Sequence, residues 1–307
     1  MIEIENLSKR YGEKLAVDGL NFTVQPGIVT GFLGPNGAGK STTMRMIAGL
    51  DEPTSGTVRV NGGDYRAASA PMAELGILLE AKAVHTGRSA RNHLLALAQT
   101  NGIGRRRVDE VLDMVGLTAV AGKRVGGFSL GMGQRLGVAS ALLGDPRVVV
   151  LDEPVNGLDP EGVLWIRTLL RGLADEGRTV FVSSHLMSEM AQTASRLVVV
   201  GRGRLIADTT VDEFVARAAG GAVSVRSPEA LRLRELLLGP DVTVTTTEPD
   251  VLLVRGCTAE QIGHTAWQAR LPVYELAVQQ ASLEEAFMQL TSDAVEYRSG
   301  ADAQVPA

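Results

Sequence analysis

Residues 34–41 read Gly-Pro-Asn-Gly-Ala-Gly-Lys-Ser and directly follow an apolar run at residues 28–33. The pattern Gly-x-x-x-x-Gly-Lys-Ser, between an expected buried strand and a helix expected from Thr42 to about Leu50, is typical of a loop that surrounds phosphate groups. Glycine lets the backbone turn so that successive N–H groups point at one anion, and the helix N-terminus adds partial positive charge. A glycine-rich turn with an incidental lysine is the alternative interpretation. The complete match favours a nucleoside triphosphate site.

The residues of this loop have separate expected roles. We expect Lys40 to reach the β- and γ-phosphates and to act in catalysis, and the Ser41 hydroxyl to bind Mg²⁺. Both residues also belong to the predicted nucleotide-binding set, whose other members in this loop and helix are Gly34, Pro35, Asn36, Gly37, Ala38, Gly39 and Thr42.

A second apolar run, at residues 148–151 after Arg147, ends in the acid pair Asp152 and Glu153. Such a continuous run suits a central parallel strand that is covered on both faces. Asp152 at the strand end is placed to hold Mg²⁺, directly or through water, and Glu153 to orient a water for attack on the γ-phosphate. Taken alone, the pair is equally compatible with two acids that open a loop. Beside the phosphate loop, it predicts a site that hydrolyses the nucleotide.

A third pattern lies between the two. Residues 128–135 read Phe-Ser-Leu-Gly-Met-Gly-Gln-Arg and lead into an apolar helix, for which Ser129 is a good N-cap. The order of phosphate loop, Ser-x-Gly-x-x-Gln-Arg and acid-tipped strand resembles the ATP-binding subunits of ABC transporters. Ser129 and Gly131 match that family's signature, whereas Leu130 and Met132 depart from its commonest form. The variant Ser-Leu-Gly-Met resembles the drug-resistance and antibiotic-export (ABC-2 type) branch.

The resemblance implies roles for four further residues. Asp159 takes the acidic position of the family's D-loop, and His185, after an apolar strand at 180–184, takes that of the switch histidine that contacts the γ-phosphate and assists catalysis. Tyr11 matches the aromatic residue that stacks on adenine, although stacking tolerates any purine. Glu80 stands where the family usually has a metal-sensing glutamine, so its expected metal contact differs from that of an amide. A structural histidine and an exposed loop glutamate remain the alternatives for His185 and Glu80.

Composition is that of a protein domain without a membrane span. Apolar residues make up 45% of the 307, and no apolar stretch approaches the ~20 residues that cross a bilayer. The first residues lack the features of a signal peptide, and the single cysteine, Cys257, excludes an internal disulfide and fits a reducing cytoplasm. The net charge of −5 disfavours a dedicated nucleic-acid binder, and the basic run at 105–107 is interpreted as solvated.

The pattern of elements predicts an α/β P-loop NTPase fold with a RecA-like parallel sheet, an antiparallel β part and a helical arm at about 84–145. Strands at 148–151, 179–183 and 197–200 alternate with helices, which is typical of a parallel sheet. This ABC-type ATP-binding domain is expected over 1–219. Residues 220–291 follow the order β-α-β-β-α-β, which suggests a small, ferredoxin-like α+β accessory domain. We expect 292–307 to be a disordered tail.

The resemblance implies an ATPase that binds ATP and Mg²⁺ and works as a homodimer, in which Ser129 and Gly131 of one copy close over the nucleotide of the other. It further implies separate transmembrane permease subunits and peripheral attachment to the cytoplasmic face of the cell membrane. The function expected is therefore that of the energising subunit of an exporter. The alternative is a soluble ABC ATPase acting in translation or DNA maintenance. Whether the exported compound is a drug, lipid, peptide or other natural product stays open.

Overall fold

The structure is a computed structural model that describes residues 1–79, 84–219, 222–278 and 282–291. It divides into two compact units, Met1–Thr210 and Val211–Leu290. Helix α8 (Val211–Ala219), which lies inside the domain expected at 1–219, belongs by its contacts to the second unit. Glu80 and the tail expected at 292–307 lie outside the described residues.

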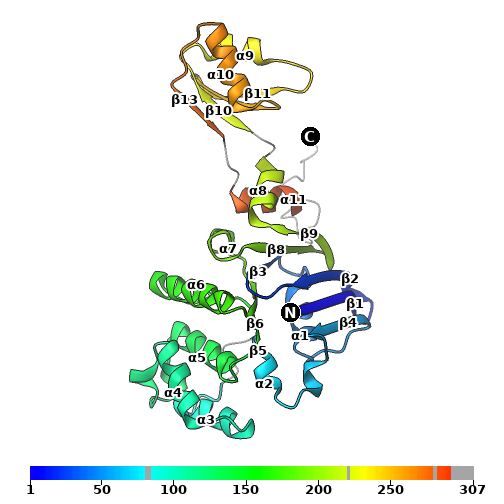
Figure 1. Cartoon of the computed structure of the whole chain (residues 1–307), viewed down its shortest axis with the longest axis vertical. Helices are drawn as coiled ribbons and strands as arrows, with labels where there is room; N and C mark the ends of the chain where they lie inside the picture. The colour runs from blue at the N-terminus through cyan, green and yellow to red at the C-terminus, as the bar shows by residue number, and fades with distance from the viewer. Residues whose placement is uncertain (80–83, 220–221, 279–281, 292–307) are drawn as a thin grey trace, which may run out of the picture. The chain divides into compact units, whose positions relative to one another are not determined.

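A six-stranded sheet with the order β5-β6-β7-β3-β8-β9 forms the centre of the first unit (Figure 1). Its strands are β3 (Val29–Leu33), β5 (Leu75–Leu78), β6 (Val148–Leu151), β7 (Thr179–Ser183), β8 (Arg196–Gly201) and β9 (Arg204–Thr210). The first five run parallel, and β9 pairs antiparallel with β8. Every residue of β3, β6 and β7 is buried, which accounts for their continuous apolar runs. The predicted parallel sheet is confirmed.

An antiparallel sheet with the order β2-β1-β4 completes the β part of this unit. It consists of β1 (Ile2–Tyr11), β2 (Lys14–Val24) and β4 (Ser55–Val60). Phe22 of β2 packs against Phe32 of β3 and Phe181 of β7, with ring centroids 4.9–5.9 Å apart. These three tilted rings form the centre of the core shared by the two sheets.

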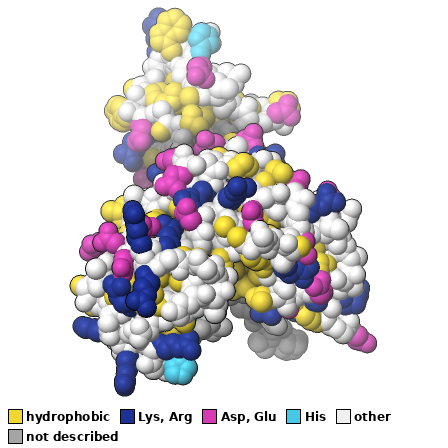
Figure 2. Space-filling view, turned by 60° about the horizontal axis from the view of Figure 1, so that its bottom comes forward, with side chains coloured by type: hydrophobic (Ala, Val, Ile, Leu, Met, Phe, Trp, Pro, Cys, Tyr) yellow, Lys and Arg dark blue, Asp and Glu magenta, His cyan; other side chains and the backbone are white. Residues whose placement is uncertain are grey.

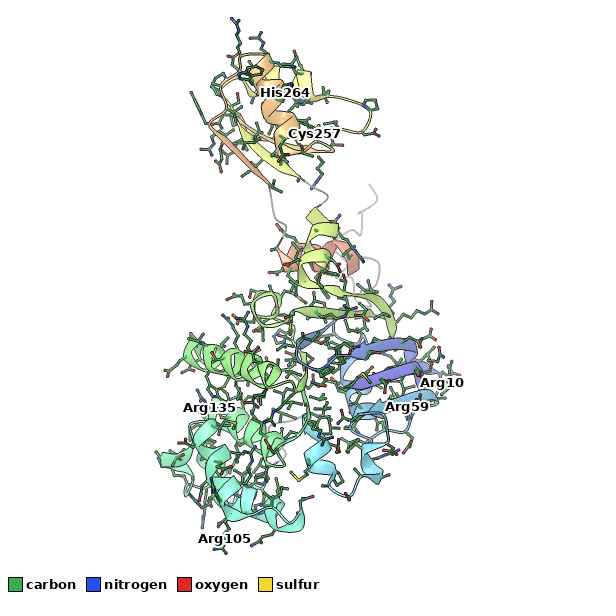
Figure 3. The ribbon with its side chains drawn as sticks, in the orientation of Figure 1. Arg10, Arg59, Arg105, Arg135, Cys257 and His264 are labelled. Carbon is green, nitrogen blue, oxygen red and sulfur yellow. The ribbon has the colours of Figure 1, made fainter. Side chains whose placement is uncertain are left out.

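Helices cover the parallel sheet and form the expected helical arm. The helices of the first unit are α1 (Lys40–Ile47), η1 (Tyr65–Ala67), α2 (Pro71–Glu74), α3 (Ala90–Thr100), α4 (Arg105–Met114), η2 (Thr118–Val120), η3 (Val125–Gly127), α5 (Leu130–Leu142), α6 (Pro160–Asp175) and α7 (Met187–Thr193). The arm comprises α3, α4 and α5. Arg135 of α5, labelled in Figure 3, lies 4.2 Å from the ring centroid of Trp165 on α6 and donates a hydrogen bond to the Val115 carbonyl oxygen. The arm is thereby joined to the helix that follows the acid pair.

The basic run at the start of α4 contributes to packing as well as to the surface. Arg107 donates hydrogen bonds to the carbonyl oxygens of Leu142 and Leu143 and pairs with Asp145 at 3.1 Å. Arg105 projects from the outer end of the arm (Figure 3). Acidic and basic side chains are interspersed on the face of the first unit that Figure 2 shows.

Four antiparallel strands in the order β11-β12-β10-β13 form the sheet of the second unit. They are β10 (Val223–Arg226), β11 (Thr243–Glu248), β12 (Val251–Arg255) and β13 (Glu275–Val278). The helices of the unit are α8, α9 (Ala230–Leu237), α10 (Ala259–Gln268) and α11 (Leu283–Thr291). Because α9 follows β10 and α10 follows β12, this is the split β-α-β arrangement of the ferredoxin-like fold that the element order predicted. Cys257 is partly buried beside α10 (Figure 3).

The aromatic cluster gives a stability prediction. Replacing Phe181, which is fully buried, by alanine leaves a cavity between the two sheets and should lower the free energy of unfolding by about 3–5 kcal/mol. The matched control is Leu231→Ala, since that side chain is 68% exposed and its loss should change stability by no more than about 0.5 kcal/mol. Urea denaturation measures both variants. Equal stability of the two variants would contradict the placement of the phenylalanine cluster at the centre of the core.

Candidate nucleotide-binding site

A cavity of about 440 Å³ lies at the carboxyl ends of the parallel strands, which is where open α/β sheets bind their ligands. Three segments distant in the sequence line it. They are the end of β1 and start of β2 (Tyr11, Lys14, Ala16), the loop and first turn of α1 (Asn36, Gly37, Ala38, Gly39, Lys40, Ser41, Thr42), and the acid pair (Asp152, Glu153). Gly34 and Pro35 complete the loop, and their carbonyl oxygens accept hydrogen bonds from Lys40. The structure therefore brings together the phosphate loop, the acid pair and Tyr11.

Glycine is required at two positions of the loop. Gly39 has φ +98°, and a Cβ atom there would lie 2.6 Å from the Ala16 carbonyl oxygen. A Cβ atom on Gly34 would lie 2.5 Å from the Val200 carbonyl oxygen. Neighbouring backbone thus fixes the loop from both sides. Since α1 begins at Lys40, the N–H groups of its first turn have no partners within the helix and are available to an anion.

Lys40 is buried at the base of this loop. Its ammonium donates hydrogen bonds to the carbonyl oxygens of Gly34 at 2.6 Å and Pro35 at 3.3 Å. Burial lowers the pKa of Lys40, while the nearby carboxylates of Glu153 and Asp152 act in the opposite direction. The loop therefore presents a positive charge and free N–H groups on the same side of the cavity.

Asp152 joins the phosphate loop to strand β7. The Ser41 hydroxyl donates a hydrogen bond to one carboxylate oxygen of Asp152 at 3.0 Å, and the Ser183 hydroxyl donates to the other. Ser183 also accepts a hydrogen bond from the Glu153 N–H at 2.9 Å. Sequence reasoning gave Ser183 no role; the available signal was a hydroxyl residue at the end of the strand adjacent to β6. The two oxygen groups at Ser41 and Asp152 fit Mg²⁺, which is usually bound by few protein oxygens together with substrate phosphates.

Glu153 is held in an unusual backbone conformation beside His185. Its φ of +51° is uncommon for a residue other than glycine. Its carboxylate oxygen lies 2.7 Å from His185 Nδ1, and its carbonyl oxygen accepts a hydrogen bond from the Gln134 side chain at 3.2 Å. The surrounding contacts thus fix the acid that the sequence predicted to orient water. Gln134, which was part of the quoted motif but had no assigned role, links α5 to this acid.

The signature and D-loop residues do not belong to the described lining of this cavity. The Ser129 hydroxyl accepts a hydrogen bond from the Met132 N–H and caps α5, and Asp159 likewise caps α6 through the Gly162 N–H. A Cβ atom on Gly131 would lie 3.0 Å from the Gly157 carbonyl oxygen, so the start of α5 lies close to the loop that precedes α6. Among the described residues, those that line the cavity include neither Ser129, Gly131 nor Asp159.

A glycine-rich phosphate loop, an aspartate bonded to the serine of that loop and a glutamate–histidine pair together define a P-loop nucleoside triphosphatase. Comparisons with known proteins give its family. Residues 17–156 match the family model described as ABC transporter, and residues 221–284 match a domain of unknown function. The chain belongs to the ATP-binding proteins of ABC transporters, and within them it is similar to members of the drug and antibiotic export branch, as its motifs predicted.

Two relatives and one solved structure illustrate this similarity. The chain is 41% identical over 220 residues to the bacitracin transport ATP-binding protein BcrA of Bacillus licheniformis, covering 71% of this chain and 72% of that protein. It is 33% identical over 303 residues to the daunorubicin resistance ATP-binding protein DrrA3 of Streptomyces coeruleorubidus, covering 95% and 96%. The dimeric post-hydrolysis structure of the cassette MJ0796 with ADP and Pi superimposes with a TM-score of 0.62 at 25% identity, covering 68% of this chain and 98% of that one. The P-loop fold and the assignment as an ATPase are confirmed.

In the described part of the chain, no helix combines the length and the apolar character that spanning a bilayer requires.

The geometry of the loop gives a second prediction. Gly39→Ala should weaken ATP binding by roughly tenfold or more, because the new Cβ atom forces the loop away from Ala16 and the backbone conformation is strained. Gly102→Ala is the matched control, since Gly102 also has positive φ (+67°) but no atom within 4 Å of an added Cβ. Titration calorimetry with magnesium ATP measures both. An unchanged affinity in Gly39→Ala would show that the loop need not keep this conformation.

Proposed function

We propose that this chain is the ATP-hydrolysing subunit of an exporter, and that ATP-driven closure of a homodimer of such subunits powers export of a drug or other small molecule by separate membrane subunits. One observation carries the proposal: a single cavity joins Lys40, Ser41, Asp152 and Glu153, in a chain whose similarity to a daunorubicin resistance ATP-binding protein extends over nearly its full length. In this proposal the chain attaches to the cytoplasmic face of the membrane through its permease partners.

The proposed binding of ATP divides the nucleotide between two parts of the cavity. Lys40 and the N–H groups of the loop hold the β- and γ-phosphates, and Thr42 adds a hydroxyl beside them. Tyr11, which is 47% exposed at the edge of the cavity, stacks on the base. Ser41 and Asp152 would hold Mg²⁺, which neutralises charge on the phosphates; Glu80, outside the described residues, is retained as a further proposed contact.

Hydrolysis is assigned to Glu153 and His185. We propose that Glu153 orients a water toward the γ-phosphate and accepts its proton, and that His185 holds the Glu153 carboxylate in place and contacts the phosphate. The short distance between Glu153 and His185 Nδ1 supports this division of roles. The Ser183 hydroxyl, which bonds to Asp152 and to the Glu153 backbone, keeps the two acids at a fixed spacing.

The proposed dimer accounts for the residues that the cavity does not include. Ser129, Gly131 and Asp159 of one copy would face the nucleotide bound to the other copy, in a two-fold, self-complementary arrangement. Shifting such an equilibrium from 1:99 to 99:1 requires about 5.5 kcal/mol. Hydrogen bonds to charged phosphate contribute about 1.5–3 kcal/mol each, so a few at each of two sites suffice. The dimer reported for the similar cassette MJ0796 supports this arrangement.

Glu153→Gln tests the catalytic assignment. The amide cannot accept the proton of water, so we expect ATP binding to persist while turnover falls about a hundredfold or more. ATP-bound dimer should accumulate, which light scattering after size-exclusion chromatography detects. Asp175→Asn, an exposed change on α6, is the control and should hydrolyse ATP normally. Unimpaired hydrolysis by Glu153→Gln would remove Glu153 from its role.

Purification from membranes tests the proposed partners. We expect the tagged full-length chain to co-purify with a polytopic membrane protein, and the ATPase activity of the complex to change when transported compounds are added. Consistent recovery of ribosomes or DNA instead would favour a role in translation or DNA maintenance.

A further inference from the structure

The hydroxyl of Tyr11 is bound to a residue that no motif contains. Tyr11 is the last residue of β1, and its hydroxyl donates a hydrogen bond of 2.6 Å to the Asp51 carboxylate. Asp51 lies in the segment that follows α1, 40 residues further along the chain. The ring itself is half exposed at the edge of the cavity, so packing restrains it only in part and the hydrogen bond to Asp51 adds to that restraint.

Asp51 is itself held by Arg45 of α1. Nε and Nη2 of Arg45 donate hydrogen bonds to the two carboxylate oxygens of Asp51, at 2.8 and 3.1 Å. Such two-point pairing fixes the plane of a carboxylate as well as its position. The hydrogen bonds from Arg45, and next the one from Tyr11, lower the pKa of Asp51 to about 2. The hydrogen bond to Asp51 raises the pKa of Tyr11, so the phenol remains the donor.

These contacts connect the ring to the phosphate loop through one short helix. Helix α1 begins at Lys40, whose ammonium lies at the base of the loop, and it carries Arg45 one turn later. Arg45 holds Asp51, and Asp51 holds Tyr11. The Lys9 ammonium lies over the Tyr11 ring, 5.0 Å from its centroid, and 47% of the residue is still exposed.

We propose that Asp51, oriented by Arg45, is a positioning residue that holds the Tyr11 ring at a set distance from the phosphate loop and so prepares it to stack on a purine base. This inference rests on the proposed nucleotide site. A ring that is already ordered loses less conformational freedom when the base binds, and the difference appears as affinity. Asp51 should therefore affect the affinity for nucleotides through their base. It should affect neither the binding of a bare triphosphate nor the chemical step.

A double-mutant cycle with two ligands tests the proposal on the full-length chain. The variants are Tyr11→Phe, which keeps the ring and loses the hydroxyl, Asp51→Ala, and the double variant. The ligands are magnesium ATP and magnesium tripolyphosphate, measured by calorimetry, with KM and kcat for ATP measured alongside. The control is Asp64→Ala, since Asp64 is paired with Arg66 in the same way and is exposed; its loss should leave every value unchanged.

We expect Asp51→Ala to weaken ATP binding and raise KM about tenfold, the effect of one hydrogen bond to a charged group, with kcat and tripolyphosphate affinity unchanged. In the Tyr11→Phe background the same change should add less than about twofold, because the hydroxyl through which Asp51 acts is gone. Fully additive effects, or an equal loss of tripolyphosphate affinity, would overturn the proposal. Failure of the unaltered chain to bind ATP would instead overturn the nucleotide site itself.

Discussion

The carboxylate of Asp152 receives one hydrogen bond from Ser41, at the start of α1, and another from Ser183, at the end of β7. An aspartate side chain is short, so these contacts form only if β3, β6 and β7 end at the same level of the sheet. The parallel register achieves this, because Leu151 lies beside Val182 and Phe32 beside Ser183. The phosphate loop, Asp152 and the histidine after β7 then necessarily meet at one edge. The three buried phenylalanine rings beneath them keep the sheets in that relation.

Much of the fold could be predicted because buried parallel strands have a simple signature. Residues 148–151 are all apolar, as are the three central residues of 179–183, and the structure buries both segments completely. The phosphate loop could be predicted because its chemistry depends on residues adjacent in the sequence. The ferredoxin-like order of the second unit followed from the succession of short alternating strands and helices. Helix α8 was different: Phe214 is fully buried, and neither its spacing nor its flanking residues indicate which unit's core it joins.

The residues that sequence reasoning missed share a physical reason. Ser183 acts on acids about 30 residues earlier, and Asp51 on a tyrosine 40 residues earlier. Gln134 likewise reaches Glu153 across 19 residues. Side-chain hydrogen bonds of this kind depend on how elements are placed after folding, and no periodicity or spacing records them. The left-handed backbone of Glu153 was not predicted either. Its cost is offset by the contacts of Ser183, Gln134 and His185, which form only after folding.

The arginine-bound carboxylate beside the cavity has a consequence for acid tolerance. The pKa of Asp51, about 2, is below its ordinary value, so folding favours the ionised carboxylate. The contribution of Asp51 to stability is lost as the pH falls toward that pKa. Between roughly pH 5 and 8, where histidine side chains change charge, Asp51 stays ionised and Tyr11 stays protonated. Mild acidification should therefore leave the hydrogen bond between Tyr11 and Asp51 intact.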